Sequence, residues 1–275
     1  MSDARTPVVS GTHYPALPAR LRADVRALLA DAPAARRARG VVAPHDALRY
    51  SGRTAADAFG GVEVPATCVV LAPNLTGRRS MPQGASLLTS KRYRTPLGEV
   101  EVDAMLARAI ADRGIALVAA DDEVAHAEEE SVEALLPLIQ MRNPEARVVP
   151  LLLSWGDWER TARLARAIAD SCGDRDDVLI VAASNMNAGS TADAGADLDS
   201  LALDRITHLD GEGLLRLVVA EGIAMSGAVP VACACEAVRL LGGTAGELVG
   251  YSHSGLVSGR EGGVVGYAAV LLGVR

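Results

Sequence analysis

The stretch VLIVAA at residues 178–183 is apolar at every position. Strands that are buried on both faces read this way, whereas half-exposed strands alternate apolar and polar residues. The stretch TPLGEVEVD at 95–103 alternates apolar and acidic residues, which is typical of a half-exposed strand. The further apolar runs that we interpret as strands are GVVA at 40–43, TCVVLA at 67–72, RVVPLLL at 147–153, and residues 229–232 and 264–272.

Segments with the apolar spacing of helices lie between these runs. The clearest is 157–172, where Asp157 is suited to cap the first turn and Gly173 follows the last one. Strands that alternate with helices predict an α/β sandwich around a central mixed, mostly parallel sheet. No Pro/Ser-rich linker divides the chain, so we expect residues 1–275 to form a single domain. Two further helices are expected at 131–140 and 201–208.

The composition excludes several classes of protein. The 275 residues carry 27 Lys+Arg and 34 Asp+Glu, a net charge of −7, and no basic stripe, which argues against nucleic-acid and anionic-membrane binding. No run approaches the roughly 18 apolar residues of a membrane span, and no secretory signal is recognised. The four cysteines are therefore interpreted as reduced thiols, and a cytoplasmic location is expected.

Polar residues follow several of the predicted strands. In doubly wound sheets, ligands bind at the carboxyl ends of the strands, so these positions are the first candidates for a site. The usual nucleotide-binding, serine-hydrolase and zinc motifs are missing from the sequence. The residues that follow the strands and could contact a ligand are His45, Tyr50, Asn74, Asn185, Asn187 and Cys233.

Six short motifs are distributed over almost the whole chain. They are SGTHYP at 10–15, PHDALRYSG at 44–52, TPLGEVEVD at 95–103, EESVEALLP at 129–137, YSHSG at 251–255 and VGYA at 265–268. They resemble the motifs of the Memo family, the B component of the AmmeMemoRadiSam gene set, which is related to class III extradiol dioxygenases; the third and fourth are the most specific. The resemblance implies a class III extradiol dioxygenase-like α/β sandwich.

The resemblance also implies a redox metal, iron or copper, held by two histidines and a cysteine. His45 matches the first histidine and Cys233 is taken as the cysteine, but the second histidine falls on Leu75. Asn185 replaces a carboxylate of the family, and Glu130 replaces a further histidine. Because a metal site needs about three fixed protein ligands, the site is interpreted as degenerate.

Other side chains could compensate or line the pocket. Glu130 could complete a His/Cys/Glu ligand set if it points into the pocket, although Glu128 to Glu130 also suit a solvated helix start. Asn74 could offer its amide oxygen. His126 is expected in a surface loop. The residues expected to bind a cofactor or a small polar or aromatic molecule are His13, Tyr50, Asn74, Asn185 and Asn187.

Three functional hypotheses stay open. In the first, the chain is a small-molecule-binding or partner subunit that has lost its metal site, alone or in a homo-oligomer. In the second, it is a metal-dependent oxidoreductase or dioxygenase-like enzyme that uses His45 and Cys233, with Glu130 as a third catalytic group. In the third, Cys233 performs metal-free thiol chemistry, activated by His45. The pattern of replaced ligands favours the first.

Overall fold

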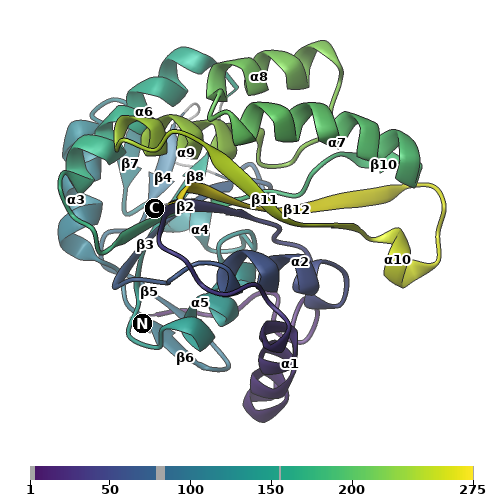
Figure 1. Cartoon of the computed structure of the whole chain (residues 1–275). Coiled ribbons are helices and arrows are strands. Elements are labelled where there is room, and N and C mark those ends of the chain that lie inside the picture. The colour runs from purple at the N-terminus through teal and green to yellow at the C-terminus, as the bar shows by residue number, and fades with distance from the viewer. Residues whose placement is uncertain (1–3, 79–83, 155, 275) are drawn as a thin grey trace.

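The computed structural model describes residues 4–78, 84–154 and 156–274, and its centre is a sheet of nine strands (Figure 1). Eight strands follow the order β10-β12-β2-β9-β3-β8-β4-β7, and β11 also pairs with β12. The bounds are β2 Ala38–Ala43, β3 Thr67–Pro73, β4 Ala85–Leu87, β7 Val118–Ala120, β8 Arg147–Leu153, β9 Val178–Ala183, β10 Ala188–Ser190, β11 Gly246–His253 and β12 Val264–Val274.

The four inner strands β2, β9, β3 and β8 are mutually parallel, whereas β12 and β4 pair with them in antiparallel orientation. Every residue of β3 and β9 is buried. The prediction of a mixed sheet with continuous apolar runs at its centre is thus confirmed. The sheet as a whole is not mostly parallel, because among the described residues four strand pairings are parallel and four are antiparallel. A second sheet orders β1-β5-β6; its strands are β1 Ala4–Arg5, β5 Arg92–Thr95 and β6 Gly98–Val100.

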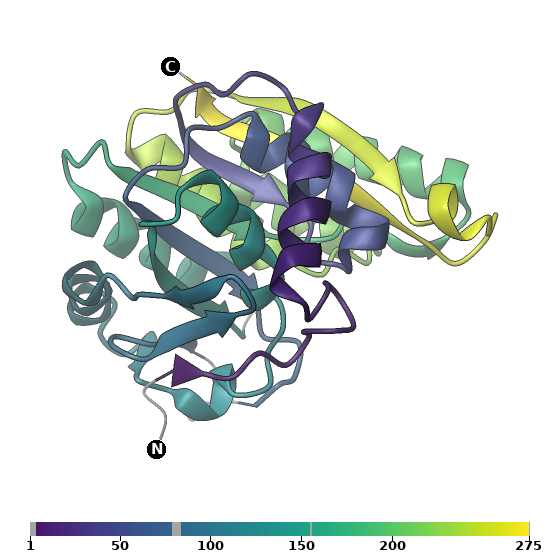
Figure 2. The same ribbon diagram turned by 90° about the horizontal axis from the view of Figure 1, so that it is seen from below.

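Helices cover both faces of the large sheet and bury two apolar clusters (Figure 1). One face carries α3 Ala104–Arg113, α6 Trp158–Cys172, α7 Ala192–Thr207, α8 Gly211–Ala220 and α9 Ala228–Leu240. Figure 2 shows the other face, where α1, in dark purple, lies beside α2. The remaining elements are α1 Pro18–Ala30, α2 Leu48–Gly60, α4 Glu123–His126, the 3₁₀ helix η1 Glu133–Leu135, α5 Leu136–Arg142 and α10 Gly255–Ser258.

The predicted helix at 157–172 is confirmed together with its ends. The Asp157 side chain accepts a hydrogen bond from the Arg160 amide, which caps the first turn of α6. Gly173 ends the helix with a φ of +53°, a conformation that glycine adopts without strain. Of the other two predicted helices, 201–208 is the second half of the longer α7, and 131–140 begins as a turn that leads through η1 into α5.

Two predicted strands are wrong. Residues 229–232 belong to α9, because a short apolar run reads alike in a buried helix and in a buried strand. Residues 95–103 form no single strand: they turn from β5 into β6, and Asp103 then caps α3 by accepting a hydrogen bond from the Leu106 amide. Their alternation comes from a hairpin whose outer side chains face solvent.

Candidate functional site

Three segments that are distant in the sequence meet at His45, which follows the carboxyl end of β2. The His45 amide donates to Oδ1 of Asn185, and the imidazole Nε2 lies 3.1 Å from the hydroxyl of Ser226. The backbone N–H of Asn185 also donates to this hydroxyl, at 3.0 Å. The ends of β2 and β9 are therefore joined to the start of α9 through one imidazole and one hydroxyl.

A glycine allows Ser226 to approach β9 so closely. A Cβ atom built at Gly227 would lie 2.2 Å from the carbonyl oxygen of Ala183, so any other residue would force the two segments apart. The Gly227 amide donates to the Ser184 hydroxyl, which in turn donates to the carbonyl of Asn185. Ser226 is thus held at a fixed place beside the imidazole.

The imidazole of His45 is neutral at physiological pH. Burial lowers the pKa of His45 to about 4; the charge of Asp46 raises it and the nearby His13 lowers it. The side chain is only 3% exposed, and its Nδ1 atom has no hydrogen-bond partner among the described residues. A buried ring nitrogen without a partner costs about 1–3 kcal/mol, so Nδ1 of His45 is an unsatisfied polar atom of this site.

Asp46, the residue after His45, lines a hollow of about 480 Å³ together with Tyr50 and Arg260. Its carboxylate accepts hydrogen bonds from the Tyr267 hydroxyl and from the Ala47 amide, both at 2.6 Å. Burial and this bond raise the pKa of Tyr267, so the phenol keeps its proton. Tyr50 lines this hollow, and the guanidinium of Arg49 stacks on its ring at 4.6 Å. The binding role expected of Tyr50 stays a prediction.

His13 and Glu130 lie together on another side of the site. Nε2 of His13 is 3.7 Å from Oε1 of Glu130, and the His13 carbonyl accepts a hydrogen bond from the Leu48 amide. His13 also borders a hollow of about 640 Å³ between α1 and α2. Its Nδ1 atom is another buried ring nitrogen without a partner in the part of the chain that the structure describes. The roles predicted for His13 and Glu130 stay predictions.

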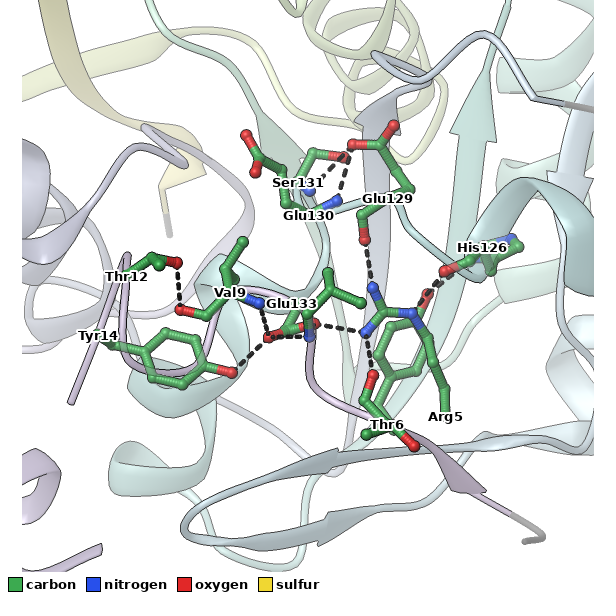
Figure 3. Close-up of polar contacts among 12 residues, drawn as sticks. Arg5, Thr6, Val9, Thr12, Tyr14, His126, Glu129, Glu130, Ser131 and Glu133 are labelled. Atoms are coloured by element: carbon green, nitrogen blue, oxygen red, sulfur yellow. Dashed lines mark hydrogen bonds and ion pairs between the residues drawn. The ribbon is translucent and has the colours of Figure 1, made fainter. Parts of the chain in front are cut away.

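A buried ion pair fixes the N-terminal segment that carries His13 (Figure 3). The guanidinium of Arg5 donates to Oε2 of Glu133 at 2.5 Å, and both side chains are nearly inaccessible. Oε1 of Glu133 accepts from the Tyr14 hydroxyl and from the Val9 amide. We call Arg5, Tyr14 and Glu133 the N-terminal anchor. Because Tyr14 directly follows His13, this anchor determines where His13 lies.

The polar side-chain atoms of Asn74 are occupied by hydrogen bonds to nearby residues. Its Nδ2 donates to the Arg78 carbonyl and the Ser154 hydroxyl, and its Oδ1 accepts from Thr76, so Asn74 stabilises its own loop. The next residue, Leu75, is half exposed.

Asn187 is likewise occupied. Its Nδ2 donates to Ser190, and its Oδ1 accepts from the Ala224 amide. Asn185 is the one of the three asparagines whose side chain bonds directly to His45. Cofactor binding by any of the three stays a prediction.

Cys233 does not follow a strand, as the sequence suggested, but lies inside α9. It is fully buried, five residues into the helix, which is about 7.5 Å along the axis from its first residue. Burial raises the pKa of the Cys233 thiol, so the thiol stays protonated. No hydrogen bond joins Cys233 to His45 in the described part of the chain; the side chain that faces the imidazole is the hydroxyl of Ser226.

The residues around His45 do not fit the metal that the resemblance implies. A site with two imidazoles and a thiolate needs three lone-pair donors, and here one imidazole faces a neutral hydroxyl, a poor ligand for such a metal. Leu75, at the position matched to the second histidine, has no donor atom. Within residues 4–78, 84–154 and 156–274, no three His, Cys, Asp or Glu side chains converge in a way that could hold a metal ion.

Comparison with known proteins assigns the family. The sequence model described as "Memo-like protein" matches residues 5–271. The chain belongs to the Memo family. MEMO1 family proteins of Methanothermobacter thermautotrophicus and Methanopyrus kandleri are each 34% identical to it, over 96% and 97% of this chain and 98% of their own length. The MEMO1 family protein of Aquifex aeolicus is 30% identical over 97% of this chain and 98% of its own. In the described part of this Memo family chain, no helix is long and apolar enough to cross a membrane.

Sequence reasoning noted Asp46 only as one of the polar residues that follow a strand, and it missed Ser226 and the N-terminal anchor. A usable signal existed for Ser226: Ser226 and Gly227 precede an apolar run that contains Pro230, and such a combination is typical of a helix start. No local pattern marks the anchor, because Arg5 and Glu133 are 128 residues apart. His126 was misplaced for the same reason. Both of its ring nitrogens are hydrogen-bonded, to Tyr93 and to the Ser86 carbonyl, and it is buried rather than in a surface loop.

Proposed function

We propose that this Memo family chain has a degenerate metal site and binds a small polar molecule beside His45, in the cytoplasm, on a dioxygenase-like scaffold. The observation that carries the proposal is the 3.1 Å contact between Nε2 of His45 and the hydroxyl of Ser226. The ring nitrogen that would ligate a metal thus faces a hydroxyl group, which cannot replace a thiolate.

The space around this contact supports the binding of a small molecule. Two hollows, of about 480 and 640 Å³, border residues next to His45, and both volumes lie in the usual range of small-molecule sites. The ring nitrogens without partners on His13 and His45 offer hydrogen bonds to a polar ligand. A hydrogen-bonding ligand, rather than a metal, would then satisfy the buried polar atoms.

The test is an anaerobic calorimetric titration with Fe(II), together with elemental analysis of protein that was purified without chelators. The wild type is expected to bind no stoichiometric iron or copper. The double substitution Ser226→Cys and Leu75→His supplies a thiol and an imidazole, and it is expected to gain about one equivalent of metal. Cys233→Ser is the matched control, because it changes a thiol outside the site, and it is expected to behave as the wild type.

Two results would contradict the proposal. One is a full equivalent of iron or copper in the wild type that His45→Gln removes; this would favour the metal-dependent oxidoreductase. The other is a folded double variant that gains no metal, which would mean that Ser226 and Leu75 do not mark the lost ligand positions.

A further inference from the structure

We propose that Ser226 and His45 form a nucleophile–base pair that accepts the acyl group of a small, uncharged ester. This inference goes beyond ligand binding, because it assigns covalent chemistry to the hydroxyl that faces the imidazole. It rests on the hydrogen bonds of Ser226, the position of His45 beside it and the start of α9.

The hydrogen bonds at Ser226 direct its proton toward the base. The backbone N–H of Asn185 donates to Oγ of Ser226 at 3.0 Å and occupies one of its lone pairs. The hydroxyl hydrogen of Ser226 is therefore free to point to another acceptor. Nε2 of His45 lies 3.1 Å away, within the reach that proton transfer requires. Because the imidazole is neutral at pH 7, Nε2 is available as an acceptor when Nδ1 carries the ring proton.

The start of α9 offers donors for the negative charge that develops on an acyl oxygen. This 13-residue helix begins two residues after Ser226, and no side chain caps it. Within the described residues, the amides of Ala228 and Val229 donate to no other group, and Pro230 has no amide hydrogen. Free amides at a helix start stabilise an oxyanion, and their partial positive charge favours an ionised nucleophile beside them.

The base of this pair is buried and incompletely hydrogen-bonded. The His45 side chain is 97% buried, and its Nδ1 atom has no partner among the described residues. The charges nearby restrict which acyl donor can bind. Asp46 follows His45 directly but shares its hollow with Arg260, and Glu130 pairs with His13, so charges of both signs surround the site and favour neither an anionic nor a cationic acyl donor. An uncharged ester fits best.

The chemistry would proceed in two balanced halves. Oγ of Ser226 attacks the carbonyl carbon and forms a C–O bond while its proton passes to Nε2 of His45. The tetrahedral oxyanion collapses, the ester C–O bond breaks, and the leaving alcohol takes the proton from His45. Water then attacks the acyl-serine in the same way, which releases the carboxylic acid and restores the hydroxyl and the neutral imidazole.

The experiment uses diisopropyl fluorophosphate, a small uncharged reagent that phosphorylates serine nucleophiles with loss of fluoride. The full chain is incubated with the reagent and then measured by intact mass and by peptide mapping. One adduct at Ser226 is expected. His45→Gln is expected to slow its formation about 100-fold or more, which is the usual contribution of a general base. Cys233→Ala, outside the pair, is expected to react as the wild type.

A second variant keeps the test valid if His45→Gln fails to fold. Ser226→Ala keeps the imidazole but removes the hydroxyl, and it is expected to take up no reagent. The proposal is overturned if Ser226 carries no adduct, or if the adduct forms equally fast in folded His45→Gln. The metal titration measures a different property. A protein that binds no metal and does not react with the reagent would contradict the nucleophile–base pair but not the proposal of a degenerate metal site.

Discussion

The N-terminal anchor and the His45 site are both buried, polar and assembled from distant segments, yet they differ in how completely their atoms are paired. In the anchor, both oxygens of Glu133 accept hydrogen bonds, and Arg5 donates to Glu133 as well as to the carbonyls of His126 and Glu129. In the site, Nδ1 of His45 has no partner in the described residues. A network whose polar atoms are all hydrogen-bonded stabilises one conformation, whereas an incompletely bonded network contains polar atoms that a ligand could bond.

Hydrogen bonds also connect the N-terminal anchor with the His45 site. Glu129 and Glu130 lie between them: Oε1 of Glu129 accepts from the amide of Glu130, and the carboxylate of Glu130 points to His13. Tyr14, next to His13, donates to Glu133. We infer that the N-terminal anchor holds the residues of the His45 site in place.

The largest effect is expected from breaking the anchor. Glu133→Gln removes the charge that compensates Arg5, and an unpaired buried charge costs about 3–5 kcal/mol. The free energy of unfolding, measured with urea, should fall by that amount. Glu63→Gln, which breaks an exposed ion pair with Arg37, is the control and should change it by about 0.5 kcal/mol or less. Similar losses for both variants would mean that the anchor is no more important than a surface pair.

An intermediate effect is expected from acid. Burial lowers the pKa of both His45 and His126 to about 4, below the unfolded value near 6.5. The unfolded chain therefore binds more protons in this range, and folding stability falls as the pH drops from about 6.5 to 4. Each histidine contributes on the order of 3 kcal/mol to this loss.

The pH dependence separates the two regions if it is measured by urea unfolding at several pH values. In His126→Gln, the loss between pH 7 and 4 should be smaller than that of the wild type by on the order of 3 kcal/mol, whatever the variant's stability at pH 7. A loss of unchanged size would show that His126 does not titrate with a lowered pKa in the folded protein.

The smallest effect is expected from two matched phenols. Tyr14→Phe removes a hydrogen bond to the fully buried carboxylate of Glu133 and should cost about 1–3 kcal/mol. Tyr267→Phe removes a similar bond to Asp46, which borders a hollow where water can replace the phenol, so about 1 kcal/mol or less is expected. Unfolding curves for both variants give the comparison, and the reverse order would contradict the distinction between the two regions.

The sequence predicted those parts of the fold whose signal is local. The inner strands were found because two-sided burial leaves a continuous apolar run, and α6 because Asp157 and Gly173 mark its ends. The start of α9 was lost because its first residues are apolar on every side, so neither a period of two nor one of 3.6 is visible. Because of this error, Cys233 instead of Ser226 was expected beside His45.

The site was predictable only in part, for a physical reason. The expectation that polar groups gather at strand ends identified His45 and Asn185, which do contact each other. The partner of the imidazole is 181 residues away, and which hydroxyl reaches it depends on how α9 packs against β9. Long-range pairing of this kind leaves no mark in a single sequence.

The most direct test of the central claim is a long-range ¹H–¹⁵N NMR spectrum of the His45 ring at pH 7, before and after one equivalent of Zn(II), with His45→Gln used for assignment. If Nε2 accepts the Ser226 hydroxyl, the ring is neutral with its proton on Nδ1, and its signals stay in place when Zn(II) is added. A Zn(II)-dependent shift at Nε2, characteristic of a coordinated nitrogen, would contradict the account.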